Sequence, residues 1–309
     1  MPSTIEFCNL GYDEFAALKE KIAFTALRLT PDSAAFGENI FTGSIAENSR
    51  CFLFEYHDNH VPVVSFIILP AGRKVYYQYA DSVSLQTVQS LIKGNITKCC
   101  LQEQGNFCLH AAAMCMGDKA ILFIGRKGAG KSTLSAYLHL QQHAVWCDDY
   151  SVLQLQENSF FVSQGETALK INPEIVTAFN IPAGQIKSVF ELPDHWDQTS
   201  LSALISSKYY FKRPATDNDI RPRKVAAIFF LHERMPAPQK IITPISKVNA
   251  FSILMDEILL PGINSRNYLN TYFQSALQLL EIVPSYHVNS PDDISRIHEV
   301  YESILETVS

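Results

Sequence analysis

Hydrophobic and polar positions follow a strand-like pattern over the first third of the chain. Apolar or alternating runs at 50–56 and 61–69 flank four polar residues, which predicts a β-hairpin, and the run at 74–79 predicts a third strand. Apolar residues then recur at helical spacing, so a helix is expected over roughly 83–103. Residues 1–105 are therefore expected to form a small α+β segment with an antiparallel or mixed sheet.

The pattern changes after residue 105. A buried-looking run at 107–116 and a second at 120–124 predict two strands joined by a turn. A helix is expected at about 130–142, followed by a strand at 144–147. Strand, loop, helix and strand in this order indicate a β-α-β unit within a parallel or mixed sheet, and therefore an α/β core.

The rest of the chain continues without a linker, so residues 106–309 are expected to form one core with C-terminal helices. The run at 225–231 predicts a buried strand. A final helix is expected to begin with Ser290 as its N-cap and Pro291 in its first turn. A helix before it is predicted from the apolar face Leu269, Tyr272, Phe273, Ala276, Leu277 and Leu280.

One motif stands above the others: G-R-K-G-A-G-K-S-T matches the phosphate-binding P-loop pattern G-x-x-x-x-G-K-[ST]. Glycines let successive N–H groups point inward, and the helix that follows favours anions at its N-terminus. Lys131 is expected to reach the outer phosphates and Ser132 to bind Mg²⁺. The alternative is a glycine-rich turn without a ligand. The predicted nucleotide-binding residues are Gly125, Arg126, Lys127, Gly128, Ala129, Gly130, Lys131, Ser132 and Thr133.

Two further elements surround this loop in the sequence. Asp148 and Asp149 end the strand expected to neighbour the P-loop strand, where a magnesium-binding carboxylate belongs; the alternative is a turn with solvated aspartates. His110 lies on an apolar strand that ends shortly before the P-loop strand, so the two strands are expected side by side. A functional histidine and a satisfied core histidine are both consistent with that position.

Composition and charge narrow the class of protein. The 25 basic and 31 acidic residues give a net charge of -6, which argues against nucleic acid or an anionic membrane as partners. There is no signal-peptide pattern and no apolar run of about 20 residues, so a soluble cytoplasmic protein is expected. Seven cysteines without a C-x-x-C spacing indicate reduced thiols. Neither N-K-x-D nor an L-S-G-G-Q-type signature occurs, which disfavours a GTPase and an ABC ATPase.

The motifs L-H-A-A-A at 109–113, the P-loop, and C-D-D-Y at 147–150, in this order, resemble the HPr kinase/phosphorylase family. The resemblance implies a P-loop core related to phosphoenolpyruvate carboxykinase, with a mixed sheet, behind the α+β segment. Within the family, the chain looks most like the kinases that phosphorylate a serine of lasso peptides and other ribosomally made peptides. It therefore implies ATP and Mg²⁺ as cofactors, a peptide or small protein as substrate, and a homo-oligomer.

The resemblance also implies roles for individual residues. His110 matches the histidine beside the phosphates, while Asp148 and Asp149 match the paired aspartates. We assign the base to Asp148 and the metal to Asp149, with the order of the two left open. Lys170 matches a basic position of the peptide kinases. The catalytic set is thus His110, Lys131, Asp148 and Asp149, with Ser132 and Asp149 at the metal.

The acceptor is not defined by any motif. The basic segment 208–224, with Arg221 and Arg223, guides an acidic or carboxylate-ended peptide or is simply a solvated loop. The glycine-rich signature of the bifunctional enzymes is missing, so phosphorolysis is not expected. The alternatives are a small-molecule kinase on the same core and a nucleotide-binding regulator without transfer activity.

Overall fold

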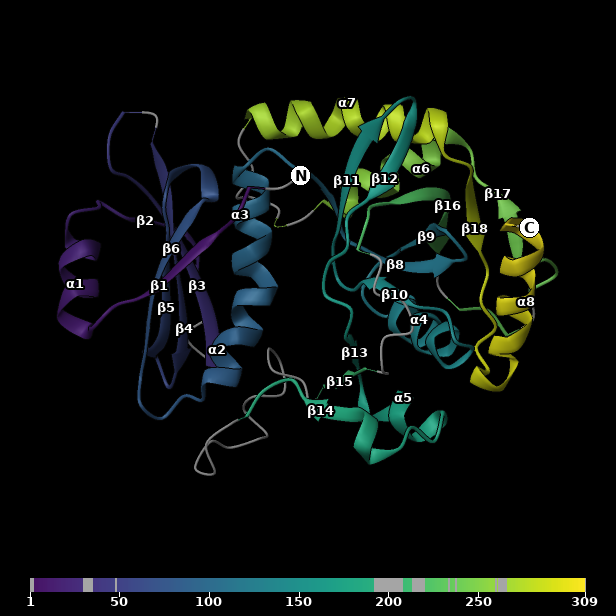
Figure 1. Ribbon diagram of the computed structural model, residues 1–309, viewed down its shortest axis with the longest axis horizontal. Coiled ribbons are helices and arrows are strands. Elements are labelled where there is room, and N and C mark those ends of the chain that lie inside the picture. The colour runs from purple at the N-terminus through teal and green to yellow at the C-terminus, as the bar shows by residue number, and fades with distance from the viewer. Residues whose placement is uncertain are drawn as a thin grey trace.

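A computed structural model describes residues 3–29, 36–47, 49–191, 208–212, 220–232, 234–236, 238–258, 260 and 266–308. The chain forms a mixed α/β structure, as the sequence predicts. Figure 1 shows one sheet from the N-terminal segment on the left and a second, larger sheet on the right, with the α2–α3 helical run between them. We use "N-terminal segment" for residues 1–105 and "core" for the remainder.

The sheet of the N-terminal segment has the strand order β1-β6-β5-β4-β3-β2. The predicted hairpin and third strand are confirmed as consecutive antiparallel strands, and β1 pairs with β6 in parallel, which makes the sheet mixed. The strands are β1 (Glu6–Asn9), β2 (Thr25–Arg28), β3 (Phe36–Ser44), β4 (Arg50–Asp58), β5 (Val61–Ile68) and β6 (Lys74–Tyr79), with a 3-10 turn η1 (Pro70–Gly72).

Helices cover both faces of this sheet, and alternate residues of β4 pack against the helices on opposite sides. Phe52 and Phe54 pack against α2 (Leu85–Leu91) and α3 (Thr97–Glu103), whereas Leu53 packs on the side of α1 (Tyr12–Glu20). The helix predicted over 83–103 is present but interrupted. A π-type turn η2 (Ile92–Ile96) separates α2 from α3, since Gly94 leaves the helical conformation at φ -86° and ψ -123°.

The sheet of the core has the order β10-β8-β9-β16-β12-β11-β7, with β18 paired to β16 and β17 to β18. β9 and β16 run in parallel, while β8 and β9 are antiparallel, so this sheet is also mixed. The strands are β7 (Phe107–Leu109), β8 (Ala111–Met116), β9 (Lys119–Ile124), β10 (Val145–Cys147), β11 (Ser151–Gln156), β12 (Ser159–Val162), β16 (Arg223–Leu231), β17 (Ile242–Pro244) and β18 (Ser285–Val288).

Two sequence predictions are wrong in this sheet. The run at 107–116 is not one strand: it divides at His110, because β7 pairs with β11 while β8 pairs with β9 and β10. The strand that carries the aspartates does not neighbour the P-loop strand either. β8 lies between β10 and β9, so one strand separates the two chemical motifs. The strand expected to carry His110 begins only after it, as β8, and β8 lies beside the P-loop strand as predicted.

Both faces of β9 are buried, which explains its uninterrupted apolar sequence. Leu122 and Ile124 pack toward α6 (Lys247–Asp256) and α7 (Arg266–Ile282), whereas Ile121 and Phe123 pack toward α4 (Lys131–Leu140) and α8 (Ile297–Val308). In Figure 1, α7 lies along the top of the core, α4 below its sheet and α8 at the right.

The last helix begins later than the sequence predicts. Ser290 is not its N-cap: the side chain of Asp293 accepts a hydrogen bond from the N–H of Ser295 and caps a 3-10 turn η5 (Ile294–Arg296) that leads into α8. Pro291 instead pairs with Met235 in an isolated bridge. The expected Ser-Pro start fails because residue 291 is bound to another strand-like segment.

A small third sheet of the core lies below its large sheet in Figure 1, with the order β13-β15-β14. It consists of β13 (Leu169–Ile171), β14 (Ile186–Ser188) and β15 (Tyr209–Phe211), accompanied by α5 (Pro173–Ala178) and a 3-10 turn η3 (Ala183–Gln185). All the cysteines fall within the described residues, and none forms a disulfide. Among the described helices, none combines the length and apolar character needed to span a bilayer.

Candidate active site

The P-loop joins β9 to α4 as the motif predicts, and its glycines are sterically required. A Cβ on Gly125 would lie 2.7 Å from the carbonyl oxygen of Leu231, so only glycine fits beside β16. Gly130 caps α4 with φ 101°, a left-handed conformation that favours glycine. The loop therefore presents backbone N–H groups and the positive end of α4 to the same place, which is the arrangement that binds phosphate.

Lys131 is the first residue of α4, and its ammonium group donates a hydrogen bond to the carbonyl of Gly125 across the loop. Burial lowers the pKa of Lys131, while Glu257, Asp149 and Asp148 partly offset that effect. The P-loop lysine is therefore close enough to both aspartates to interact with them electrostatically. Lys131 and the two aspartates, which lie 17 and 18 positions later in the sequence, therefore influence one another electrostatically in the folded chain.

Asp148 follows β10 and is 6% exposed. Its Oδ2 accepts a hydrogen bond from the backbone N–H of Lys170 at 2.9 Å. Burial, together with the adjacent Asp149 carboxylate, raises the pKa of Asp148 to about 7. A carboxylate with a pKa near neutral is suited to accept a proton from a hydroxyl.

Asp149 has the opposite electrostatic environment. Its backbone lies in the left-handed region with φ 64°, and its Oδ2 is 3.0 Å from the ammonium of Lys170 and 4.0 Å from that of Lys98. Burial would raise the pKa of Asp149, but Lys98 and Lys170 outweigh it and hold that pKa well below its ordinary value. The two adjacent carboxyl groups therefore differ in protonation at neutral pH, as two groups with different tasks should.

His110 lies at the break between β7 and β8, next to the end of α6. Its Nδ1 is 3.1 Å from Oε2 of Glu257, and this hydrogen bond is the main cause that lowers the pKa of Glu257. His110 is therefore held by a carboxylate, and it acts electrostatically on Asp149. Arg126 pairs with Asp256 at 3.3 Å, but both side chains are largely exposed, so this ion pair is expected to contribute little.

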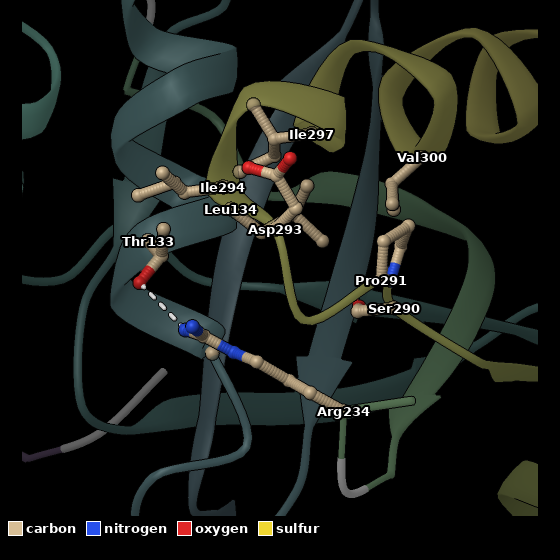
Figure 2. Close-up of a pocket in the computed structure, with 10 residues that line it drawn as sticks. Thr133, Leu134, Arg234, Ser290, Pro291, Asp293, Ile294, Ile297 and Val300 are labelled. Atoms are coloured by element: carbon tan, nitrogen blue, oxygen red, sulfur yellow. Dashed lines mark hydrogen bonds between the residues drawn. The ribbon is translucent and has the colours of Figure 1, made fainter. Parts of the chain in front are cut away.

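A pocket opens at the other side of the P-loop, where α4 begins (Figure 2). Arg234, which follows β16, reaches the Oγ1 of Thr133 at 3.5 Å and passes 3.6 Å from the position of a Cβ on Gly130. Asp293 and Ser290 contribute polar atoms to the pocket. The remaining wall is apolar and consists of Leu134, Pro291, Ile294, Ile297 and Val300.

The residues assigned to Mg²⁺ are chemically suitable. The Ser132 hydroxyl and the Asp149 carboxylate are oxygen donors, which Mg²⁺ prefers, and the ion normally takes only one or two carboxylates together with substrate phosphates. Within the described residues, no group of three His, Cys, Asp or Glu side chains could hold a metal. A metal at this site would accordingly depend on the nucleotide for most of its ligands.

The basic segment is only partly described, because residues 213–219 lie outside the described residues. Lys208 acts electrostatically on Asp148, which brings this end of the segment toward the site. The register of β16 places Arg223 seven residues before Phe230, the partner of Ile124, roughly 23 Å along the strand from the P-loop. Its guanidinium lies 5.0 Å from the ring centre of Trp146. Arg221 is exposed.

Three residues of the site have no counterpart in the sequence predictions: Lys98, Glu257 and Arg234. A signal existed for Glu257, because Asp256 and Glu257 end α6, where the helix dipole disfavours negative charge without a partner. Lys98 and Arg234 carried no such signal. They belong to elements far from the motifs in sequence, and only the tertiary structure brings them to the P-loop.

No protein-family model and no curated protein matches the chain. Among solved structures, it is similar to the Hpr(Ser) kinase/phosphatase from Coxiella burnetii, with 15% sequence identity and a TM-score of 0.28. The similarity covers 65% of this chain and 97% of that one. At this TM-score the similarity carries no argument about activity, and the mixed α/β fold class stands on the sheets and helices described above.

Proposed function

We propose that the protein is a kinase that transfers the terminal phosphoryl group of ATP to a hydroxyl group. The observation that carries this proposal is the convergence of the P-loop lysine with two adjacent aspartates whose pKa values are driven apart. Phosphoryl transfer requires positioning and charge compensation more than covalent participation by the protein. The site offers both.

In the proposed reaction, the acceptor hydroxyl gives its proton to Asp148, and its oxygen attacks the terminal phosphorus. The bond between that phosphorus and the bridging oxygen breaks, and ADP leaves with the electron pair. Lys131 offsets charge on the outer phosphates, while His110, oriented by Glu257, faces the same region. Mg²⁺, held by Ser132 and Asp149, would supply further charge compensation.

The acceptor that we propose is a serine hydroxyl of a peptide, as in the tailoring of lasso and other ribosomally made peptides. Its support is the motif resemblance, together with Lys208, whose charge acts on Asp148 and would favour an acceptor with negative charge. The nucleoside end of ATP would extend to the side of Arg234, because the P-loop binds the inner phosphates toward the start of α4.

The test uses the purified protein with Mg-ATP and synthetic peptides that each carry one serine, in acidic and in neutral contexts. Mass spectrometry follows the gain of one phosphate, with Lys131→Ala and Asp148→Asn as matched controls. Transfer that both substitutions abolish would support the proposal. Transfer to free serine or polyols but not to peptides would select a small-molecule kinase. Tight ATP binding without transfer to any acceptor or to water would contradict kinase activity and favour a regulator.

A further inference from the structure

A lysine from the N-terminal segment reaches into the candidate active site of the core. Lys98 lies on α3, and its Nζ is 4.0 Å from Oδ2 of Asp149. The Nζ of Lys170 on β13 lies 3.0 Å from the same oxygen. The side chains of Lys98 and Lys170 are 13% and 15% exposed, so two nearly buried ammonium groups, one from a helix of the N-terminal segment and one from a strand of the core, meet at one carboxylate.

Burial of Lys98 is costly unless it serves an interaction. A buried ammonium loses hydration that only a well-placed partner can replace, and burial indeed lowers the pKa of Lys98 against the opposing effect of Asp149. Lys98, Lys170 and His110 act electrostatically on Asp149. Lys131 on the P-loop is in turn influenced by Glu257, Asp149 and Asp148, so three lysines share the site with three carboxyl groups.

The backbone before Lys98 is shaped for this reach. The π-type turn at Ile92–Ile96 breaks the helix immediately upstream, and such turns are frequent at functional sites. Asn95 in this turn donates to Glu38 on β3 at 2.9 Å, while Arg50 on β4 pairs with Glu103 at the end of α3. The helix is thereby fixed to its own sheet on both sides of Lys98.

The same helical run is docked on the core by specific contacts. Lys93 pairs with Glu166 at 2.6 Å, and the Ser90 hydroxyl donates to the carbonyl of Val189 at 2.6 Å. Gln86 donates to the carbonyl of Ser188 at 2.7 Å. Docking of the N-terminal segment therefore determines where Lys98 stands relative to Asp149.

We propose that Lys98 is a positioning residue of the phosphotransfer site, which fixes the Asp149 side chain together with Lys170 and makes the site dependent on the docked N-terminal segment. The inference rests on the proposed kinase function. It assigns to the N-terminal segment a part of the active site.

The experiment compares Lys98→Met, Lys98→Arg and the matched control Lys93→Met in the full chain. Lys93 lies on the same helical run and bridges the same two parts, but it contacts Glu166 and not the aspartates. The rate of phosphate release or transfer from Mg-ATP gives kcat and KM, and a fluorescent ATP analogue reports nucleotide binding. We expect Lys98→Met to lower kcat by 10- to 100-fold with nucleotide affinity within 3-fold of wild type, as for removal of a group that orients a metal-binding side chain.

Lys98→Arg should restore most of kcat. Lys93→Met removes one of several docking contacts and no contact with the aspartates, so it should lower kcat by less than Lys98→Met. Equal losses in Lys98→Met and Lys93→Met, or no loss in a folded Lys98→Met protein, would overturn the inference. A double-mutant cycle of Lys98→Met and Asp149→Asn, read from the Tm, tests the contact without activity. The Tm loss of the double variant should be smaller than the sum of the single losses; additive losses would contradict the contact. Wild-type protein that neither transfers nor hydrolyses phosphate would refute the kinase proposal separately.

Discussion

The two sides of the P-loop differ in chemical character. On one side, Asp148, Asp149, Lys98 and Lys170 form a dense set of charged and mostly buried groups. On the other side, the guanidinium of Arg234 lies in a mostly apolar pocket at the start of α4. Under the proposed function, this difference would divide the tasks along one loop, with the reaction at the charged side and recognition of the nucleotide at the apolar side. Substitutions on the two sides should therefore change different kinetic constants.

The largest effect is expected from Asp148→Asn. The substitution keeps the acceptor for the Lys170 N–H but removes the proton acceptor, so kcat should fall by about 10²- to 10⁴-fold. Binding of a fluorescent ATP analogue should change little, because the residue lies on the reaction side. A variant that binds nucleotide poorly and retains kcat would reverse the assignment of the two sides.

A sizeable change of affinity is expected from Arg234→Met, the corresponding substitution on the other side. Loss of one charge-assisted contact should weaken nucleotide binding by roughly 10-fold and leave kcat within 2-fold. Titration with the fluorescent analogue measures the first quantity, and saturating Mg-ATP the second. If kcat falls instead while affinity holds, Arg234 belongs to the reaction side and the division is wrong.

A smaller effect concerns stability as a function of pH. The pKa of Asp148 is raised from 3.8 to about 7 in the folded protein, so the folded state binds the extra proton within that window. The contribution of Asp148 to stability is therefore fully present below about pH 4 and falls as the pH rises to 7. Between pH 4 and 7, the free energy of unfolding should decrease less for the Asp148→Asn protein than for the wild type. Urea unfolding at a series of pH values measures this difference. Parallel pH profiles of the two proteins would show that Asp148 ionises normally.

The smallest effect is expected from Arg126→Ala, although Arg126 lies within the P-loop itself. Its side chain is 81% exposed and its partner Asp256 58% exposed, so the Tm should stay within about 2 °C of wild type. Nucleotide affinity should also be nearly unchanged, because residue 126 would contribute to the P-loop through its backbone and not through its side chain, which makes this variant the control for Arg234→Met. A loss of nucleotide affinity as large as that of Arg234→Met would mean that any positive charge near the loop supports binding, whichever side of the loop carries it.

The sequence predicted those parts of the site whose chemistry is local. Gly130 sets the left-handed turn at the start of α4, so an eight-residue pattern is sufficient to identify the loop, whereas the need for Gly125 comes from its contact with Leu231 on β16. The hairpin follows from apolar and alternating runs on either side of a polar turn, and the burial of β9 follows from its uninterrupted apolar run. The split at His110 was missed because both halves of the run are buried, and burial does not tell which partner strand each half pairs with.

The remaining parts depend on long-range placement. Nothing near Lys98 in the sequence indicates that a helix of the N-terminal segment would place it against Asp149, 51 residues later. The position of β8 between β9 and β10 likewise follows from sheet order, which residue patterns do not encode. The expected Ser290 cap failed for a similar reason, since the bridge between Met235 and Pro291 fixes the chain there.

The alkylation rates of two buried cysteines can report how often the N-terminal segment and the core open. Cys108 packs with Leu101 and Val152 where α3 meets the core, whereas Cys147 lies inside the core; burial raises the pKa of both thiols, that of Cys147 to about 12. Neither thiol can react with an alkylating reagent until its surroundings open. Labelling rates at Cys108 and Cys147 would therefore report, in the unmodified protein, how often the N-terminal segment separates from the core and how often the core itself unfolds.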